Sequence, residues 1–226
     1  DAAIYPQDIA IGTDGSLFIV DWVVDEGLYR FSIRQVGANG IITTAAGGGS
    51  NYHDDGIPAT EANLFNLYGV AVGQDGSLYF SQGYLNYAKI RHVDKSGFIN
   101  TMADDTVLQQ PIGIEVGPDG SVYFSDAYKV QQLRPGGTIT TLGGDGTDCD
   151  ATYTIGACGD SGSALEAQLG FGARIALDPS GKINLVSGQN SGAHFVRDLD
   201  LPLRPYTDEE IAIPSKHGVE IYIFSP

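Results

Sequence analysis

Short apolar stretches and polar turns alternate in a pattern that recurs along this chain. The clearest copies are IAIGTDGSLFIVD at 9–21, VAVGQDGSLYFSQ at 70–82 and IEVGPDGSVYFSD at 114–126, with weaker copies at 175–186 and 211–224. Each copy is a short apolar strand, an Asp-Gly-type turn and a second, alternating strand. This pattern predicts a β-hairpin, because glycine supplies the positive φ that such a turn requires.

Two further strand patterns, separated by a Gly-centred turn, follow the clearest hairpins. They lie at 27–36 and 41–45, at 87–93 and 98–102, and at 129–133 and 138–142. Four antiparallel strands per unit make one blade of a β-propeller, in which neighbouring blades bury the faces that one sheet leaves exposed. The sequence therefore predicts an all-β propeller of four-stranded antiparallel blades.

The repeats also predict where the blades and their linkers lie. We expect one domain over residues 1–226, with blades at 6–47, 67–103, 111–143 and 172–205, a partial blade at 208–226, and linkers at 48–66 and 144–171. About four and a half blades are thus visible, consistent with a piece of a six-bladed ring. The linker segments 55–64 and 160–169 align without a gap, and each predicts a short helical turn followed by an inward-facing leucine, Leu64 or Leu169.

These motifs resemble NHL repeats over nearly the whole chain. The linker DGIPATEANL at 55–64 and the tail at 213–224 are similar to segments of the propellers of teneurin-like and Rhs (YD-repeat) proteins. The resemblance implies a non-catalytic extracellular module for protein or glycan recognition, scaffolding or self-association within a larger surface or secreted protein. The repeats depart from the family where its usual Asp after the second strand, present as Asp21 and Asp126, becomes Gln82 in blade two and Gly188 in blade four.

Charge narrows the classes of partner. The net charge of −16 argues against nucleic acid, whose phosphates need clustered Lys and Arg, and against anionic membrane surfaces. No apolar run is long enough to cross a bilayer, so membrane insertion is not expected. The carboxylate clusters lack the spacing of known calcium loops, which leaves calcium open and predicts no other cofactor.

The two cysteines, Cys149 and Cys158, lie in one loop. Zinc would require more ligands nearby, and a redox motif would usually have two residues between its cysteines. A local disulfide is therefore predicted, which favours an extracellular location; the alternative is two reduced cysteines that only pack.

Aromatic residues gather near the loops that follow the second strands, which share one face of a propeller. Trp22, Tyr84, Tyr87 and Tyr128, with Asp25, are the candidate binding face for a protein or carbohydrate ligand. The alternative is ordinary edge packing in a Tyr-rich β protein.

Catalysis is the remaining class. A propeller hydrolase or lyase with a metal in its central channel would place acidic residues on the first strands, where Glu115 is the lone exception among apolar residues. His92 and His194 fall on third strands, away from the axis, and are expected at the surface. The sequence thus predicts no enzyme, no catalytic residue and no metal site.

Overall fold

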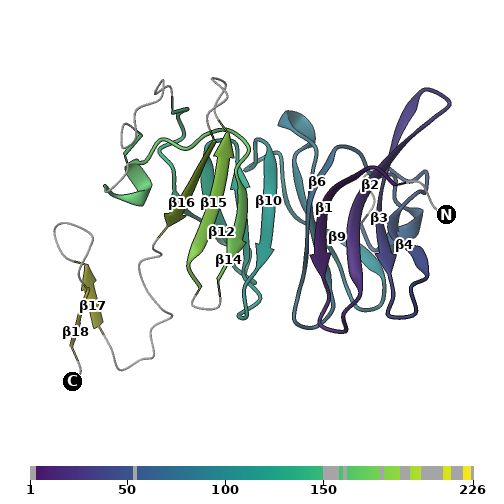
Figure 1. Cartoon of the computed structure of the whole chain (residues 1–226), viewed down its shortest axis with the longest axis horizontal. Helices are drawn as coiled ribbons and strands as arrows, with labels where there is room; N and C mark the ends of the chain where they lie inside the picture. Colours follow the sequence, from purple (N-terminus) through teal and green to yellow (C-terminus); the bar gives the residue numbers. More distant parts are fainter. Residues whose placement is uncertain are drawn as a thin grey trace.

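The protein consists of β-sheets arranged as successive propeller blades (Figure 1). The computed structural model describes residues 4–52, 55–149, 158–159, 162–178, 181–188, 194–199, 211–214 and 221–224. Within these residues the only helices are three single 3-10 turns, η1 (Ala59–Glu61), η2 (Leu85–Tyr87) and η3 (Ala164–Glu166). The predicted all-β propeller of antiparallel blades is confirmed.

Each blade is an antiparallel meander in chain order. Blade one contains β1 (Pro6–Ile11), β2 (Leu17–Asp25), β3 (Leu28–Val36) and β4 (Ile42–Gly47). Blade two contains β6 (Leu67–Val72), β7 (Leu78–Gln82), β8 (Lys89–Val93) and β9 (Phe98–Asp104), and the short strand β5 (Ile57–Pro58) pairs with β9 as a fifth.

The later sheets follow the same order. Blade three contains β10 (Pro111–Val116), β11 (Val122–Asp126), β12 (Lys129–Leu133) and β13 (Ile139–Gly143). Three strands of blade four are described, β14 (Arg174–Leu177), β15 (Ile183–Gly188) and β16 (His194–Leu199), and β17 (Ile211–Pro214) pairs with β18 (Ile221–Phe224) in a separate hairpin.

The repeated Asp-Gly-Ser motif forms the same turn in three blades. In blade one, Asp14 accepts hydrogen bonds from the backbone N–H of Ser16 at 2.9 Å and from its hydroxyl at 2.9 Å. Gly15 follows with φ of 82°, a backbone conformation that favours glycine. The same two bonds recur at Asp75 with Ser77 and at Asp119 with Ser121.

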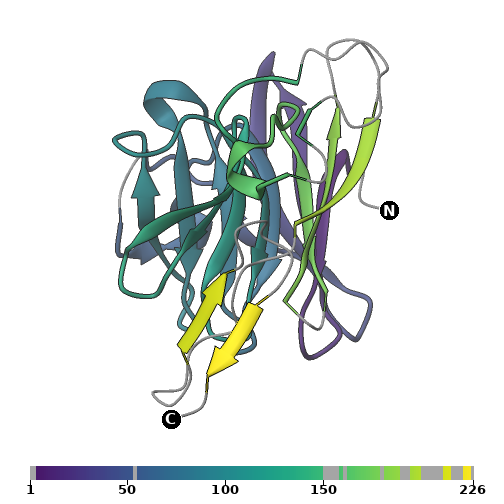
Figure 2. The ribbon, with the colours of Figure 1, turned by 90° about the vertical axis from the view of Figure 1, so that its left-hand side faces the viewer.

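The first strands of the blades, β1, β6, β10 and β14, lie side by side on the inner side of the array (Figure 1, Figure 2). A Cβ on Gly113 of β10 would lie 2.7 Å from the carbonyl oxygen of Ala173, next to β14, so the two chains can approach only because the residue is glycine. The Ser125 hydroxyl accepts the Gly113 N–H at 2.9 Å and donates to the Ala173 carbonyl at 2.6 Å. Gly69 and Ser81 join blade two to blade three in the same way.

A separate hydrophobic core fills each space between neighbouring blades. The three cores contain, in order, Val20 with Phe80, Ile90 with Phe124, and Val130 with Leu185, all fully buried. The linkers contribute to two of these cores, because Leu64 after η1 is 2% exposed and Leu169 after η3 is 1% exposed. The predicted helical turns and inward-facing leucines are therefore present.

Candidate functional site

Polar groups from all four blades lie along the inner strands; blade two contributes backbone groups. We call Asp8 of β1, Tyr68 of β6, Glu115 of β10 and Arg174 of β14 the inner-strand cluster. The Arg174 guanidinium donates to the Tyr68 carbonyl at 2.8 Å and lies 3.7 Å from a carboxylate oxygen of Asp8. The same Asp8 oxygen accepts the N–H of Val70 at 2.9 Å, which links β1 to β6.

Three members of the cluster depart from the repeat. Aligning the first strands places Asp8 and Arg174 at the position that Gly69 and Gly113 hold in blades two and three. Glu115 stands where the other three first strands have alanine, namely at Ala10, Ala71 and Ala176. Apart from these three residues, glycine or alanine occupies these positions, so the repeat pattern by itself does not call for charge there.

The cluster has the electrostatics of an acid–base site. Burial, with a further contribution from the nearby Asp8 carboxylate, raises the pKa of Glu115 to about 7. Burial also raises the pKa of Asp8, although the Val70 N–H and the Arg174 guanidinium oppose the rise. A carboxyl group with a pKa near 7 exchanges protons readily at neutral pH.

Tyr68 completes the cluster from β6. Its hydroxyl accepts a hydrogen bond from the Gln110 side-chain amide at 3.4 Å, and burial raises its pKa. The Tyr68 phenol therefore keeps its proton at neutral pH and lies beside Gln110, while the backbone carbonyl of the same residue contacts Arg174.

The expectation that Glu115 is the only acidic residue on the first strands is wrong. Asp8 lies on β1 and interacts electrostatically with both Glu115 and Arg174. The sequence pattern missed it because the repeated phrase begins at Ile9, one residue later. When the four first strands are aligned, the position of Asp8 is Gly in blades two and three and Arg in blade four, and this difference could have revealed Asp8.

A divalent cation does not fit this donor set. The described residues contain no group of three His, Cys, Asp or Glu side chains that could hold a metal ion. The positive charge beside Asp8 belongs to the Arg174 guanidinium at 3.7 Å, and the same carboxylate oxygen already accepts the Val70 N–H. His92 lies on β8, where its ring packs on Tyr79 at 4.6 Å, and the side chain of His194 is outside the described residues.

The predicted binding-face residues lie in different kinds of element: Trp22 and Asp25 are in β2, Tyr84 and Tyr87 are at η2, and Tyr128 is in the turn between β11 and β12. Trp22 packs between Tyr5 and Tyr29, with ring centroids 5.2 and 5.4 Å away. Asp25, at the end of β2, forms an exposed ion pair with Arg30 at 2.7 Å.

The tyrosines of this face contact neighbouring segments. Tyr84 is 47% exposed and Tyr87 is 56% exposed, and the Tyr87 ring meets Phe65 edge-on at 5.8 Å. Tyr128 meets Phe171 edge-on at 5.4 Å. Each ring thus has a packing partner from outside the predicted set or a large exposed surface, and whether they bind a ligand stays a prediction.

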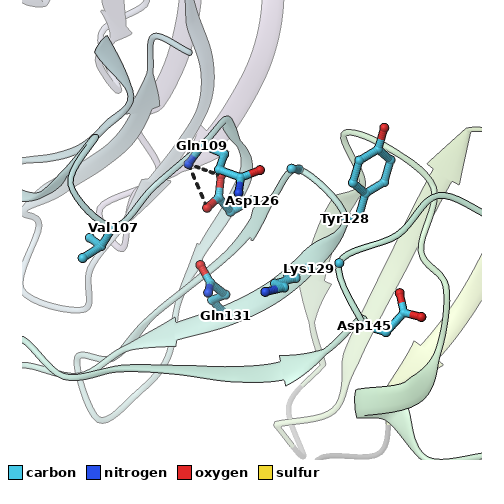
Figure 3. Close-up of a pocket in the computed structure, with 9 residues that line it drawn as sticks. Val107, Gln109, Asp126, Tyr128, Lys129, Gln131 and Asp145 are labelled. Atoms are coloured by element: carbon cyan, nitrogen blue, oxygen red, sulfur yellow. Dashed lines mark hydrogen bonds between the residues drawn. The ribbon is translucent and has the colours of Figure 1, made fainter. Parts of the chain in front are cut away.

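A second polar site lies at the end of blade three. We call it the rim cavity; it has a volume of about 220 Å³ and is lined by Val107, Gln109, Asp126, Ala127, Tyr128, Lys129, Gln131, Asp145 and Gly146 (Figure 3). Asp126 accepts the backbone N–H groups of Gln109 at 3.0 Å and Gln110 at 2.5 Å, so it holds the chain that enters β10. Asp21 does the same in blade one by accepting the N–H of Tyr5 at 2.7 Å.

The cysteine pair is bonded as predicted. Cys149 and Cys158 form a disulfide with a Cα–Cα distance of 5.4 Å, and both are 3% exposed. None of the described helices is long and apolar enough to cross a membrane. The disulfide is compatible with an oxidising compartment.

Comparison with known proteins establishes the fold alone. No protein-family model matches the chain, and no curated protein sequence matches it. Among solved structures, a gluconolactonase from Xanthomonas campestris has a TM-score of 0.56 at 14% identity over 87% of this chain and 57% of its own. A second protein, assigned as a gluconolactonase, has a TM-score of 0.50 at 16% identity, over 96% of this chain and 70% of its own. A protein of unknown function from Bacteroides thetaiotaomicron has a TM-score of 0.56 at 16% identity, and the match covers 84% of this chain and 46% of that protein.

These neighbours correct the prediction that the chain is not an enzyme. That prediction assumed that arrays of hairpin blades bind rather than react, whereas propellers sharing this fold include gluconolactonases. It also assumed a single acidic residue on the first strands, whereas Asp8 and Glu115 both lie there. The chain spans little more than half the length of the Xanthomonas enzyme.

Proposed function

We propose that this protein is a hydrolase that opens small cyclic esters, with the inner-strand cluster as its active site. The observation that carries the proposal is that Glu115 and Arg174 both interact electrostatically with Asp8, at positions where other blades have an uncharged residue. The shared fold with gluconolactonases adds support, because a gluconolactone is a cyclic ester.

Glu115 is the general base in this proposal. Its ionised carboxylate accepts a proton from a water molecule as the water oxygen attacks the ester carbonyl carbon, and the carbonyl electron pair moves onto its oxygen. When the tetrahedral intermediate collapses, the ring C–O bond breaks and the leaving alkoxide takes the proton back from Glu115. The product is an open hydroxy acid, and a pKa of about 7 suits both proton transfers at neutral pH.

Arg174 stabilises the negative charge that develops on the carbonyl oxygen. A guanidinium has several donors in a fixed plane, so it can hold two protein acceptors and still donate to a third oxygen. The Tyr68 carbonyl at 2.8 Å and the Asp8 carboxylate at 3.7 Å fix its orientation before a substrate arrives. Asp8 is thus a positioning residue, and donors set in advance are the most effective kind of transition-state stabilisation.

The experiment is lactone hydrolysis by the purified chain. Acid release from glucono-δ-lactone is measured above the spontaneous rate, and kcat/KM is expected to rise with pH to a plateau, with a midpoint near 7. Glu115→Gln should lower kcat by about 10²- to 10⁴-fold, while Glu166→Gln, an exposed carboxylate on η3, should leave it unchanged. A wild-type rate equal to the spontaneous one, or an unaffected Glu115→Gln variant, overturns the proposal.

A recognition role at the loops that follow the second strands is a second proposal. Its support is the exposure of Tyr84 and Tyr87, which are 47% and 56% exposed. A protein or carbohydrate ligand that stacks on them should lose binding in the double variant Tyr84→Ala/Tyr87→Ala, measured on immobilised glycans and candidate proteins. Equal binding by the double variant would count against this face.

The extracellular location and the kinship with NHL propellers of teneurin-like proteins are also proposals. The buried disulfide supports the first, and the matching linkers with their 3-10 turns and buried leucines support the second. Two free thiols in protein isolated from its native source would contradict secretion. A YD-repeat tract next to this segment in the parent gene would support the kinship. Its absence would contradict the assignment to the teneurin-like subgroup.

A further inference from the structure

One position of the third strand is arginine in three blades and glutamine in the fourth. Pairing with the second strands makes Arg34, Arg91, Gln131 and Arg197 equivalent, since they face Ile19, Phe80, Phe124 and Leu185 respectively. Blade three is therefore the exception, and it is the blade that carries the rim cavity.

The three arginines fill this position with bonds inside the protein. Arg91 is 3% exposed and lies 3.1 Å from Asp55 of the linker. Arg197 donates to the carbonyl of Gln168 at 2.7 Å. Arg34 lies 3.9 Å from Asp21, the aspartate that ends the second strand of blade one. In each case the guanidinium extends from the third strand to an acceptor on an adjacent segment of the same polypeptide.

Blade three keeps the aspartate that faces the arginine in blade one but lacks the guanidinium. Asp126 is the counterpart of Asp21, is 6% exposed, and burial raises its pKa. The Gln131 side chain is shorter and neutral; its Nε2 donates to Thr141 at 3.4 Å, while its buried Oε1 has no hydrogen-bond partner among the described residues. Figure 3 shows Gln131 and Lys129 projecting from β12 into the space beside Asp126. The cavity thus has a buried acceptor that calls for a donor.

We propose that the rim cavity binds the guanidinium group of an arginine side chain presented by a partner protein. The ligand takes the place that Arg34, Arg91 and Arg197 hold in the other blades, and donates to Asp126 and to Oε1 of Gln131. With Asp126 and Asp145 against Lys129, the lining carries one net negative charge. The chain's charge of −16 attracts a basic partner over a longer range.

A guanidinium fits this site better than an ammonium. Its planar donors can reach two acceptors at once, as Arg34 does with Asp21 and with the Thr43 carbonyl, which its Nε reaches at 3.3 Å. Lys129 already brings an ammonium to the cavity, and Gln131 Oε1 still has no donor. The inference is independent of the inner-strand cluster, whose residues do not line this cavity.

The test uses small probes of known charge. N-acetyl-arginine amide is titrated into the wild-type chain by NMR, with N-acetyl-citrulline amide as the neutral isostere and N-acetyl-lysine amide as the ammonium. The arginine probe should shift the backbone amides of 127–129 and the side-chain amide of Gln131, and should bind about tenfold or more tightly than citrulline. The proposal is overturned if the arginine probe shifts only amides outside the rim cavity, or if the citrulline probe binds as tightly as the arginine probe.

A matched pair of variants separates the cavity from general charge. Gln131→Arg installs the arginine of the other blades, so it should fold and should weaken binding of the arginine probe at least tenfold. Thr140→Arg adds the same charge on an exposed position of β13 and should leave binding within twofold. If both variants weaken binding of the arginine probe equally, the proposed site is refuted. If Gln131→Arg fails to fold, the amide shifts that the arginine probe causes in the wild-type chain decide alone whether the probe binds in the rim cavity.

Discussion

Replacing Glu115 should make the protein more stable at neutral and alkaline pH. The folded chain raises the pKa of this carboxyl group from 4.5 to about 7, chiefly through burial. The folded state therefore binds the proton more tightly than the unfolded state does. The stability that the protonated group contributes is fully present below pH 4.5, falls as the pH rises to about 7, and is absent above it.

The shift sets the size of the effect. A difference of about 2.5 pKa units corresponds to about 3.4 kcal/mol at 1.36 kcal/mol per unit. Glu115 is only partly buried, so solvent screening reduces this upper value to about 1 to 2 kcal/mol. Glu115→Gln, which cannot ionise, and Glu115→Ala, which restores the residue of the other three blades, should both avoid this loss.

Urea denaturation between pH 4.5 and 8 measures the effect. The free energy of unfolding of Glu115→Gln minus that of the wild type should increase by about 1 to 2 kcal/mol over this range. Taking the difference removes the titration of the other carboxylates, which both proteins share. Glu166→Gln removes an equal charge from the surface and should show a flat difference, within about 0.5 kcal/mol.

A flat difference for Glu115→Gln as well would refute the reasoning, because Glu115 would then have the same proton affinity folded and unfolded. The proposed catalytic role would lose its basis at the same time. If the stability gain appears together with loss of lactone hydrolysis, the residue has been retained at a cost in stability, as is common for catalytic groups.

Two further predictions concern the frame of the molecule. Cys149→Ser/Cys158→Ser should lower the free energy of unfolding by about 2 to 3 kcal/mol, because the disulfide closes a short loop in the unfolded chain; a urea midpoint unchanged by the double variant, or by reduction of the wild type, would contradict this. Gly113→Ala should cost about 2 kcal/mol or more, because its Cβ would lie 2.7 Å from the Ala173 carbonyl oxygen. Gly136→Ala, where a Cβ meets nothing within 4 Å, is the control and should change stability by less than about 0.5 kcal/mol.

The parts of the fold that the sequence predicted depend on local chemistry. The Asp14 carboxylate binds groups two residues away and Gly15 takes the turn conformation, so one short phrase determines each hairpin. The disulfide closes a loop within a single segment. The linker pattern predicts that Leu64 faces inward, because it places an apolar residue directly after a helical turn, and Leu64 is buried.

The candidate site depends on contacts between distant segments, which no local pattern reports. Asp8 and Arg174 are 3.7 Å apart in space but lie in the first and fourth blades. Glu115 lies inside the repeated motif and stands out there as an acidic residue, whereas Asp8 precedes the motif and does not. The rim cavity was equally hidden, since glutamine at 131 has meaning only beside the arginines at the same register position.

The repeat therefore serves as an internal reference for function. In blades two and three, a Gly and a Ser cooperate to join adjacent inner strands, as Gly113 and Ser125 do. In blade one both residues change together: Val20 replaces the serine, and Asp8 replaces the glycine and takes over the bond to the next blade through the Val70 N–H. Because the contact between blades is preserved, the charge of Asp8 is added without loss of the fold, which is what a site grafted onto a repeat requires.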